Sequence, residues 1–227
     1  MFKHVYVDLC DTLIKGNTTF MFLDSFFTHN YNRYYWFYRK ISSSFIMRAI
    51  FKLLFTAKID LNRRIAIRFL NGYSRNSLKI HVQWMLANNL FIKNKELADV
   101  IQLAKNKQIP VTIISASLDF IVEVIASHLS LNYFCSQLVY KNELCQGVII
   151  DDLLFSKNKI FDEIEKDAVS YCFISDNIQD VEILKLCSHG YGVPTLKNEK
   201  VFIKNGIEFI NYDKLINMIK MDDYERV

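Results

Sequence analysis

The chain has 227 residues, of which 51% are hydrophobic and 23% charged; this composition excludes an intrinsically disordered protein and allows one folded domain with an inserted subdomain. With 6 Gly and 2 Pro it is neither collagen-like nor a turn-rich all-β protein, and its five cysteines lack the spacing of a zinc knuckle or a disulfide framework. The formal net charge is +4. Because the first residues lack the apolar segment of a signal peptide, we expect a protein of the reducing cytoplasm.

The first predicted element is a short buried strand at residues 4–7, and residues 17–92 then differ in charge from the rest of the chain. This segment has eleven Lys or Arg against two acidic residues, a net +9, whereas the rest has 17 basic and 22 acidic residues, a net −5. Apolar residues recur with helical spacing, as in 44–55, so we expect four or five helices. Basic residues interrupt every window of about 18–20 residues, so none of these helices is expected to span a membrane.

An aromatic cluster at residues 31–38 lies within this basic segment. The segment either faces an anionic substrate, a membrane surface or nucleic acid, or is a helical layer with aromatic side chains inside and solvated Lys and Arg outside. Nucleic acid is not expected as a partner, since no helix-turn-helix or aromatic-sheet signature accompanies the basic residues.

Beyond residue 92, short apolar runs alternate with helical stretches, the pattern of a parallel sheet built from βαβ units. The predicted strands are 111–114, 137–140, 171–174 and 190–193, and the predicted helices are about 95–107, 118–130, 156–166 and 178–187. We therefore predict an α/β fold. Residues 1–16 and 93–227 form a Rossmann-like, doubly wound parallel sheet core, and residues 17–92 are inserted after the first strand as an all-helical subdomain.

Polar residues follow three of the predicted strands, at the carboxyl ends where parallel sheets bind ligands. They are Asp8, Cys10, Asp11, Thr12, Ser115, Asp176 and Asp180, with the small Ala116 after Ser115 and with Lys159 at a helix start between the third and fourth apolar runs of the core. Carboxylates, a hydroxyl and an ammonium at one sheet edge suit phosphoryl chemistry, which needs an anionic nucleophile, oxygen ligands for a hard cation and donors to phosphate oxygens.

The sequences VYVDLCDTL at 5–13, VTIISAS at 111–117 and ISDNIQD at 174–180, together with Lys159, resemble in order and spacing the four motifs of the haloacid dehalogenase superfamily. The helical insert is similar to the C1-type cap of the phosphoserine phosphatase-like branch, as is Asn142-Glu143-Leu144 followed by Gly147. The resemblance implies a Rossmann-like core with a helical cap. It also implies a Mg²⁺-dependent phosphoric monoester hydrolase that forms an aspartyl-phosphate.

The resemblance also implies a nucleophile and a metal site. Asp8 attacks phosphorus, and the carboxylates of Asp8 and Asp176 hold Mg²⁺ together with the backbone carbonyl of Cys10. Asp180, one helical turn after Asp176, completes the metal site through water or by orienting the direct ligands.

Three further positions correspond to phosphate-binding groups of the family. Ser115 donates its hydroxyl to a phosphoryl oxygen beside Ala116, and Thr12 helps to form the same cradle. Lys159 neutralises charge between the nucleophile and the transferring group, and Lys157, two residues earlier, is the alternative for this role.

Cys10 departs from the family pattern, which usually has at this position an Asp that protonates the leaving oxygen and then activates water. An ordinary thiol is a poor substitute. Asp11 is the expected replacement if the chain turns there, since adjacent residues of an extended strand point to opposite faces. Three outcomes remain open: slow phosphatase activity, the use of Asp11 or a cap residue as the acid, and another reaction such as dehalogenation or phosphonate cleavage.

The substrate must be selected by residues outside the phosphate site. Asn17 stands where phosphoserine phosphatases tend to carry an acid, so phosphoserine is not expected, and Arg63, Arg64 and Arg68 are candidate substrate contacts. A small sugar, polyol or amino-alcohol phosphate is the first expectation. A peripheral-membrane lipid-phosphate phosphatase, which touches the membrane weakly through its basic aromatic cap, and a non-catalytic phosphate-binding protein are the alternatives.

Overall fold

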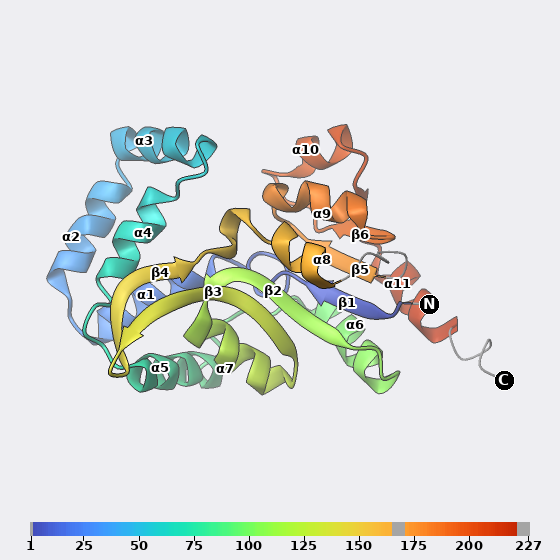
Figure 1. The fold of residues 1–227 in the computed structure, drawn as a ribbon, viewed down its shortest axis with the longest axis horizontal. Helices are drawn as coiled ribbons and strands as arrows, with labels where there is room; N and C mark the ends of the chain where they lie inside the picture. Colours follow the sequence, from blue (N-terminus) through green and yellow to red (C-terminus); the bar gives the residue numbers. More distant parts are fainter. Residues whose placement is uncertain (1, 165–170, 222–227) are drawn as a thin grey trace.

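The computed structural model describes residues 2–164 and 171–221 and contains a seven-stranded sheet between layers of helices (Figure 1). The strand order is β4-β3-β2-β1-β5-β6-β7, so the first strand of the chain lies at the centre of the sheet. The strands are β1 (His4–Val7), β2 (Val111–Leu118), β3 (Asn132–Lys141), β4 (Leu144–Asp151), β5 (Tyr171–Ser175), β6 (His189–Gly192) and β7 (Glu208–Phe209).

Each face of the sheet carries its own hydrophobic cluster, because side chains alternate along a strand. Val5 and Val7 of β1 belong to one cluster, and Tyr6 between them belongs to the other. The helices on the Val5 face are α6 (Lys95–Asn106), α7 (Asp119–Leu129) and α11 (Tyr212–Met221). Those contributing to the Tyr6 face are α8 (Asn158–Ile164), α9 (Val181–Leu186) and α10 (Glu199–Lys204). The central strands are covered on both faces, which explains their apolar sequences.

β1 pairs in parallel with both β2 and β5, as the alternation of apolar runs and helices predicted. Val7, the last residue of β1, lies beside Ile113 on one side and Ile174 on the other. The polar residues that follow these three strands therefore meet at one edge of the sheet. Among the described helices, none is both long and apolar enough to cross a membrane.

β3 and β4 form an antiparallel hairpin, which corrects the prediction of a wholly parallel sheet. The chain reverses at Asn142 and Glu143, whose φ angles of 50° and 63° lie in the left-handed region that tight hairpin turns require. Near this edge Gly147 has a φ of 64°, and a Cβ placed on it would lie 2.8 Å from the Cα of Arg68. The sheet is thus mixed at one edge, and the α/β, Rossmann-like prediction is otherwise confirmed.

Residues 17–92 form five helices, in agreement with the helical spacing of their apolar residues. Each helix begins after a residue whose side-chain oxygen accepts a hydrogen bond from a backbone amide three residues later; these capping residues are Asn17, Asn32, Ser44, Asp60 and Ser74. The helices are α1 (Thr18–His29), α2 (Arg33–Ser42), α3 (Phe45–Thr56), α4 (Leu61–Arg68) and α5 (Arg75–Ala87).

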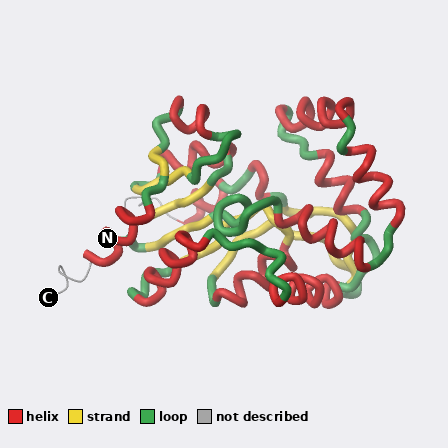
Figure 2. The backbone as a smooth tube through the Cα atoms, turned by 180° about the vertical axis from the view of Figure 1, so that it is seen from behind, coloured by secondary structure: helices red, strands yellow, loops and turns green. Residues whose placement is uncertain are grey.

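These five helices do not form one separate layer. α1 and α5 lie against the sheet layer with α7, where the Phe22 and Phe120 rings are 4.7 Å apart between centroids. α2, α3 and α4 extend away from the sheet as an arm, with α3 at its tip (Figures 1 and 2). Since α1 and α5 share a hydrophobic cluster with the sheet, a domain boundary at residues 17 and 92 remains a prediction.

Candidate active site

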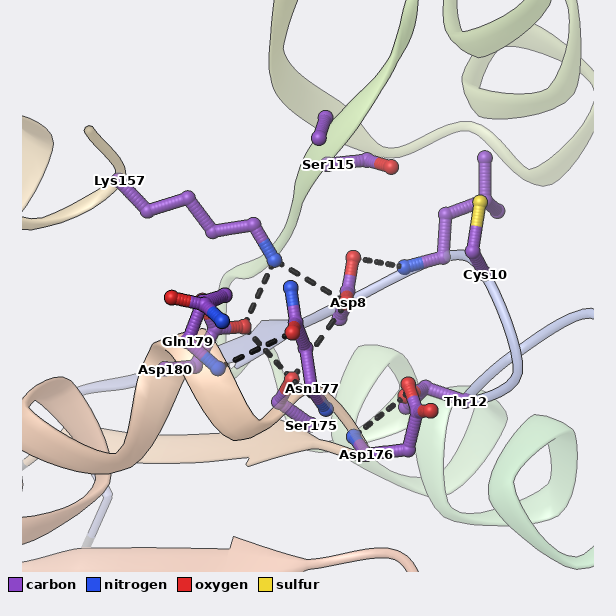
Figure 3. A network of polar contacts seen from close by, with 12 residues as sticks. Asp8, Cys10, Thr12, Ser115, Lys157, Ser175, Asp176, Asn177, Gln179 and Asp180 are labelled. Carbon is purple, nitrogen blue, oxygen red and sulfur yellow. Dashed lines mark hydrogen bonds and ion pairs between the residues drawn. The ribbon is translucent and has the colours of Figure 1, made fainter. Parts of the chain in front are cut away.

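Asp8 lies directly after β1, at the edge of the sheet where the three central strands end. Asp8 is 4% exposed, and one of its carboxylate oxygens accepts a hydrogen bond from the Leu9 amide at 2.7 Å. The Lys157 ammonium lies 3.0 Å from the other carboxylate oxygen (Figure 3). Burial raises the pKa of Asp8, with Lys157 opposing the rise. A buried carboxylate held by an ammonium in this way has the form of an activated nucleophile site.

Lys157, and not the predicted Lys159, provides the ammonium of the site. Lys157 lies in the turn before α8 and its Nζ contacts Asp8 at 3.0 Å and Asp180 at 2.7 Å. Burial alone would lower the pKa of Lys157, but the two carboxylates outweigh it and raise the pKa. Lys159 is exposed. Lys157 lies in the turn and Lys159 within α8, so the local backbone directs the two side chains differently, one into the site and the other into solvent.

Asp180 is the second carboxylate that contacts the Lys157 ammonium. It is 1% exposed, and its Oδ2 also accepts a hydrogen bond from the Ser175 hydroxyl at 2.7 Å. The same hydroxyl is 3.4 Å from Asp8 Oδ2. Figure 3 shows these side chains pointing toward one another. Asp180 therefore positions Lys157 and is linked to Asp8 through Lys157 and Ser175; its predicted contribution to the metal site, through water or by orienting the direct ligands, stays a prediction.

Asp176 follows β5 and is fixed by Thr12 from the loop after β1. The Thr12 hydroxyl donates to Asp176 Oδ1 at 3.0 Å and accepts from the Asp176 amide at 2.9 Å. Burial, and next the charge of Asp8, raise the pKa of Asp176 to about 7. Thr12 was expected in the phosphate cradle. Its hydroxyl instead ties the two loops together, because both its hydrogen bonds go to Asp176.

The residues present fit a magnesium ion. Asp8 and Asp176 line the same cavity together with Cys10. Mg²⁺ commonly takes one or two carboxylates and keeps several waters. A cation here would relieve the repulsion through which Asp8 raises the pKa of Asp176. Within residues 2–164 and 171–221, no three His, Cys, Asp or Glu side chains gather closely enough to hold a metal by themselves.

Ser115 and Ala116 lie at the end of β2 and line the same cavity. Ser115 is fully buried, and its hydroxyl oxygen accepts a hydrogen bond from the Ser117 amide at 3.1 Å. The register of β2 against β3 shifts between Ser115 and Leu118, so the chain bulges here. Bulges commonly redirect side chains next to sites. Ser115, the predicted phosphate contact, shares the wall of the cavity with Asp8.

Cys10 and Asp11 both line the cavity, because the chain turns between them and Thr12. Asp11 has a φ of 53°, so the alternation of an extended strand is interrupted there. The Asp11 carboxylate accepts a hydrogen bond from the Gly16 amide at 2.7 Å. The Cys10 sulfur lies 3.1 Å from the Thr18 hydroxyl, and burial followed by the charge of Asp8 raises the pKa of the thiol to about 11. The thiol is therefore protonated at neutral pH, and Asp11 is the carboxylate nearest in sequence that reaches the cavity.

The cavity has a volume of about 600 Å³, far more than a phosphate group fills. Its walls include residues of the helical segment and of the loops after β5 and β6. Sequence reasoning missed the lining residues Thr19, Phe55, Asp60, Leu154, Asn177, Ile178, Thr195, Leu196, Lys197 and Asn198. Asn177 and Ile178 lie inside the motif at 174–180, beside Asp176. The other residues belong to no motif, and no local signal marks them, since the fold alone brings them to one opening.

Of the three candidate arginines, Arg63 alone lines the cavity. It is buried, and its guanidinium bonds Asp152 at 2.8 Å and the carbonyl oxygen of Ala116. Arg64 and Arg68 are exposed and do not line it, because they lie on other sides of α4. Asn17 lines the cavity while its side chain caps α1. Arg63 thus links α4 to the end of β2 and to the residue that follows β4.

The comparison with protein families decides the identity of this fold. The family model of haloacid dehalogenase-like hydrolases matches residues 5–185, which include Asp8, Ser115, Lys157 and Asp176. The chain belongs to the haloacid dehalogenase-like hydrolase family. The expected superfamily is therefore confirmed. No curated protein matches this haloacid dehalogenase-like hydrolase in sequence.

Solved structures share its fold at low sequence identity. A phospho-aspartyl intermediate analogue of phosphoserine phosphatase is 15% identical with a TM-score of 0.64, over 96% of this chain and 98% of that one. A phosphoserine phosphohydrolase-like protein from Francisella tularensis subsp. tularensis SCHU S4 is 16% identical with a TM-score of 0.61, over 95% and 99%. A HAD family hydrolase from Salmonella enterica subsp. enterica serovar Typhi is 17% identical with a TM-score of 0.63, and the 92% of this chain that matches spans 66% of that one. These similarities confirm the fold of the phosphoserine phosphatase-like branch.

Proposed function

We propose that this haloacid dehalogenase-like hydrolase is a Mg²⁺-dependent phosphatase that acts on a small phosphomonoester through an aspartyl-phosphate on Asp8. One observation carries the proposal: a buried Asp8 carboxylate contacts Lys157 at 3.0 Å and shares the wall of a cavity with Asp176 and Ser115. Family membership and the fold shared with a phospho-aspartyl analogue of phosphoserine phosphatase support it.

The proposed reaction has two displacements on Asp8. A carboxylate oxygen forms a bond to phosphorus while the bond from phosphorus to the alcohol oxygen breaks, and the alcohol leaves with a proton. Water then attacks the same phosphorus, which releases inorganic phosphate and restores the carboxylate. Lys157 neutralises charge beside Asp8 in both steps, and Ser115 donates to a phosphoryl oxygen. Bound Mg²⁺, held by Asp8 and Asp176, would offset the negative charge of the phosphate.

Asp11 is the proposed proton donor to the leaving alcohol. Asp11 lines the cavity. The thiol of Cys10, with its pKa raised to about 11, stays protonated at neutral pH, so it is a weak acid for the first step and is not available as the base that activates water in the second. The Asp11 carboxylate accepts from Gly16 in this structure, so one oxygen stays available for substrate. An Asp11→Asn variant should therefore lose roughly 10²–10⁴-fold in activity if Asp11 is the acid.

The organic part of the substrate would lie between two kinds of wall. Asp60, Arg63 and Asn17 provide polar groups, and Phe55 and Leu196 provide apolar surface. Sugar, polyol and amino-alcohol phosphates fit the polar groups. Since Asn17 carries no charge, it cannot pair with an amino group as a carboxylate does, which argues against phosphoserine.

The test is phosphate release from a panel of phosphomonoesters with Mg²⁺, using the wild type, Asp8→Asn and the exposed-site control Asp99→Asn. We expect release by the wild type and the control, none by Asp8→Asn, and none after chelation of the metal. Equal release by Asp8→Asn and the wild type would refute the covalent mechanism.

A non-catalytic phosphate-binding role is the second candidate, favoured by Cys10 in place of the usual acid. It is tested by comparing the wild type with Cys10→Asp. If both bind phosphate with Mg²⁺ while neither releases phosphate from any ester, the binding role replaces the proposed phosphatase. A gain of activity in Cys10→Asp above a measurable wild-type rate would support the phosphatase.

A further inference from the structure

Helix α3 is apolar on its outward face as well as its inward face. Its inward side chains Met47, Phe51 and Leu54 are half-buried. Its outward side chains remain in solvent: Phe45 is 87% exposed, Ile46 70% and Leu53 72%. No residue of α3 is buried. A contiguous exposed apolar face of this kind commonly marks an interaction surface, so a partner for the outward face is expected.

The charge around this face selects the partner. Arg48 and Lys52, one turn apart, border the apolar stripe, and both are exposed. Residues 25–59 contain six Lys or Arg and no Asp or Glu. Two copies of this chain joined symmetrically through the face would bring basic residues together with no acidic residue of the segment to pair with them. An anionic lipid surface provides both an apolar layer and the opposite charge.

The position of α3 in the fold brings the cavity to the same surface. α3 lies at the tip of the arm, and α10 extends on the same side of the sheet (Figures 1 and 2). Phe55, at the end of α3, lines the cavity and packs against Phe155 at 5.2 Å between ring centroids. Leu196, in the loop before α10, lines the cavity too and is fully exposed. Exposed apolar side chains therefore stand on both sides of the opening.

We propose that the protein docks on an anionic membrane surface through the docking face, defined as Phe45, Ile46, Arg48, Ile50, Lys52 and Leu53 of α3. The apolar side chains enter the interface between headgroups and acyl chains, and the two basic residues contact anionic headgroups. Docking in this orientation brings the cavity opening to the headgroup layer. Docking would give the site access to a phosphomonoester carried by a lipid, in addition to the small ester proposed above; this consequence rests on the proposed phosphatase function.

Docking is tested by sedimentation of the full chain with vesicles, which needs no catalysis. The probes are phosphatidylcholine vesicles with and without phosphatidylglycerol. We expect binding to the anionic vesicles at low salt. The double variant Ile46→Ser/Leu53→Ser should lower the partition coefficient at least roughly tenfold. The matched control Leu186→Ser/Ile150→Ser removes equally exposed apolar side chains from α9 and β4 and should change nothing. Arg48→Gln and Lys52→Gln should each weaken binding roughly fivefold.

Three outcomes would overturn docking. They are no binding to anionic vesicles, equal binding to neutral ones, and an equal loss in the Ile46→Ser/Leu53→Ser and control variants. Sedimentation equilibrium without lipid tests the alternative that a second copy of the chain covers this face. If the wild type is a dimer, the Ile46→Ser/Leu53→Ser variant is a monomer, and the wild type does not bind vesicles, the face joins two copies and the lipid proposal is refuted.

The substrate consequence has its own measurement. Phosphate release is compared for phosphatidic acid in vesicles and for the best soluble phosphomonoester. The Ile46→Ser/Leu53→Ser variant should lose most of its activity on vesicles and keep its activity on the soluble ester, because neither residue lines the cavity. Vesicle binding with no release from any substrate would refute the phosphatase and leave docking intact. Release from the soluble ester alone, with docking intact, would refute the lipid substrate.

Discussion

Replacement of Lys157 by Met is the most informative perturbation of the site. The ammonium contacts Asp8 at 3.0 Å and Asp180 at 2.7 Å, and all three side chains are at most 5% exposed. Removal leaves two carboxylates that face each other without a counter-charge. Loss of one partner from a buried ion pair typically destabilises a protein by about 3–5 kcal/mol, so we expect a loss of this size in the free energy of unfolding.

The measurement is urea unfolding of the wild type, Lys157→Met and Lys159→Met in buffer with a metal chelator. Lys159 is exposed, and its replacement should change stability by less than about 0.5 kcal/mol. Lys157→Met should also lower phosphatase activity at least roughly 10²-fold, whereas Lys159→Met should keep it. Equal effects of the two substitutions, or a larger effect at Lys159, would refute the assignment of the ammonium to Lys157.

Three further predictions concern the metal, the thiol and the hairpin. Because the pKa of Asp176 is raised to about 7, a proton competes with Mg²⁺ for this carboxylate below that pH. The affinity for Mg²⁺, measured by calorimetric titration, should therefore fall by up to about tenfold per pH unit from pH 7 to pH 5. An affinity that does not change over this pH range would contradict the prediction. Because the pKa of Cys10 is raised to about 11, alkylation of this thiol by iodoacetamide should be slow at pH 7 and accelerate with pH up to about 11, as peptide mass spectrometry would show; rapid labelling at pH 7 would contradict it. Gly147→Ala should lower stability by more than Gly72→Ala, about 1–3 kcal/mol against about 1, because both have positive φ but a Cβ at Gly147 alone meets the Arg68 backbone; equal melting temperatures would contradict this.

Part of the site could be predicted from the sequence motifs. The three strand-end segments predicted that Asp8, Ser115 and Asp176 meet at one edge of the sheet, and all three line the cavity there. Such segments are readable because a buried parallel strand is a continuous apolar run, and the polar residue that ends the run must lie at the edge of the sheet. The role of Asp11 was left conditional on a turn, and the φ of 53° at this residue provides that turn.

The sequence alone determined the α/β class, the central strands and the helical insert, because periodicity and end caps are local properties of the chain. The tertiary structure decided the features that depend on direction or long-range pairing. The choice of Lys157 over Lys159 depends on which way a turn points before α8. The β3–β4 hairpin depends on two positive φ angles that Asn142 and Glu143 only permit. The outward face of α3 depends on where the arm ends, since apolar residues at helical spacing look the same whether a core or solvent lies beside them.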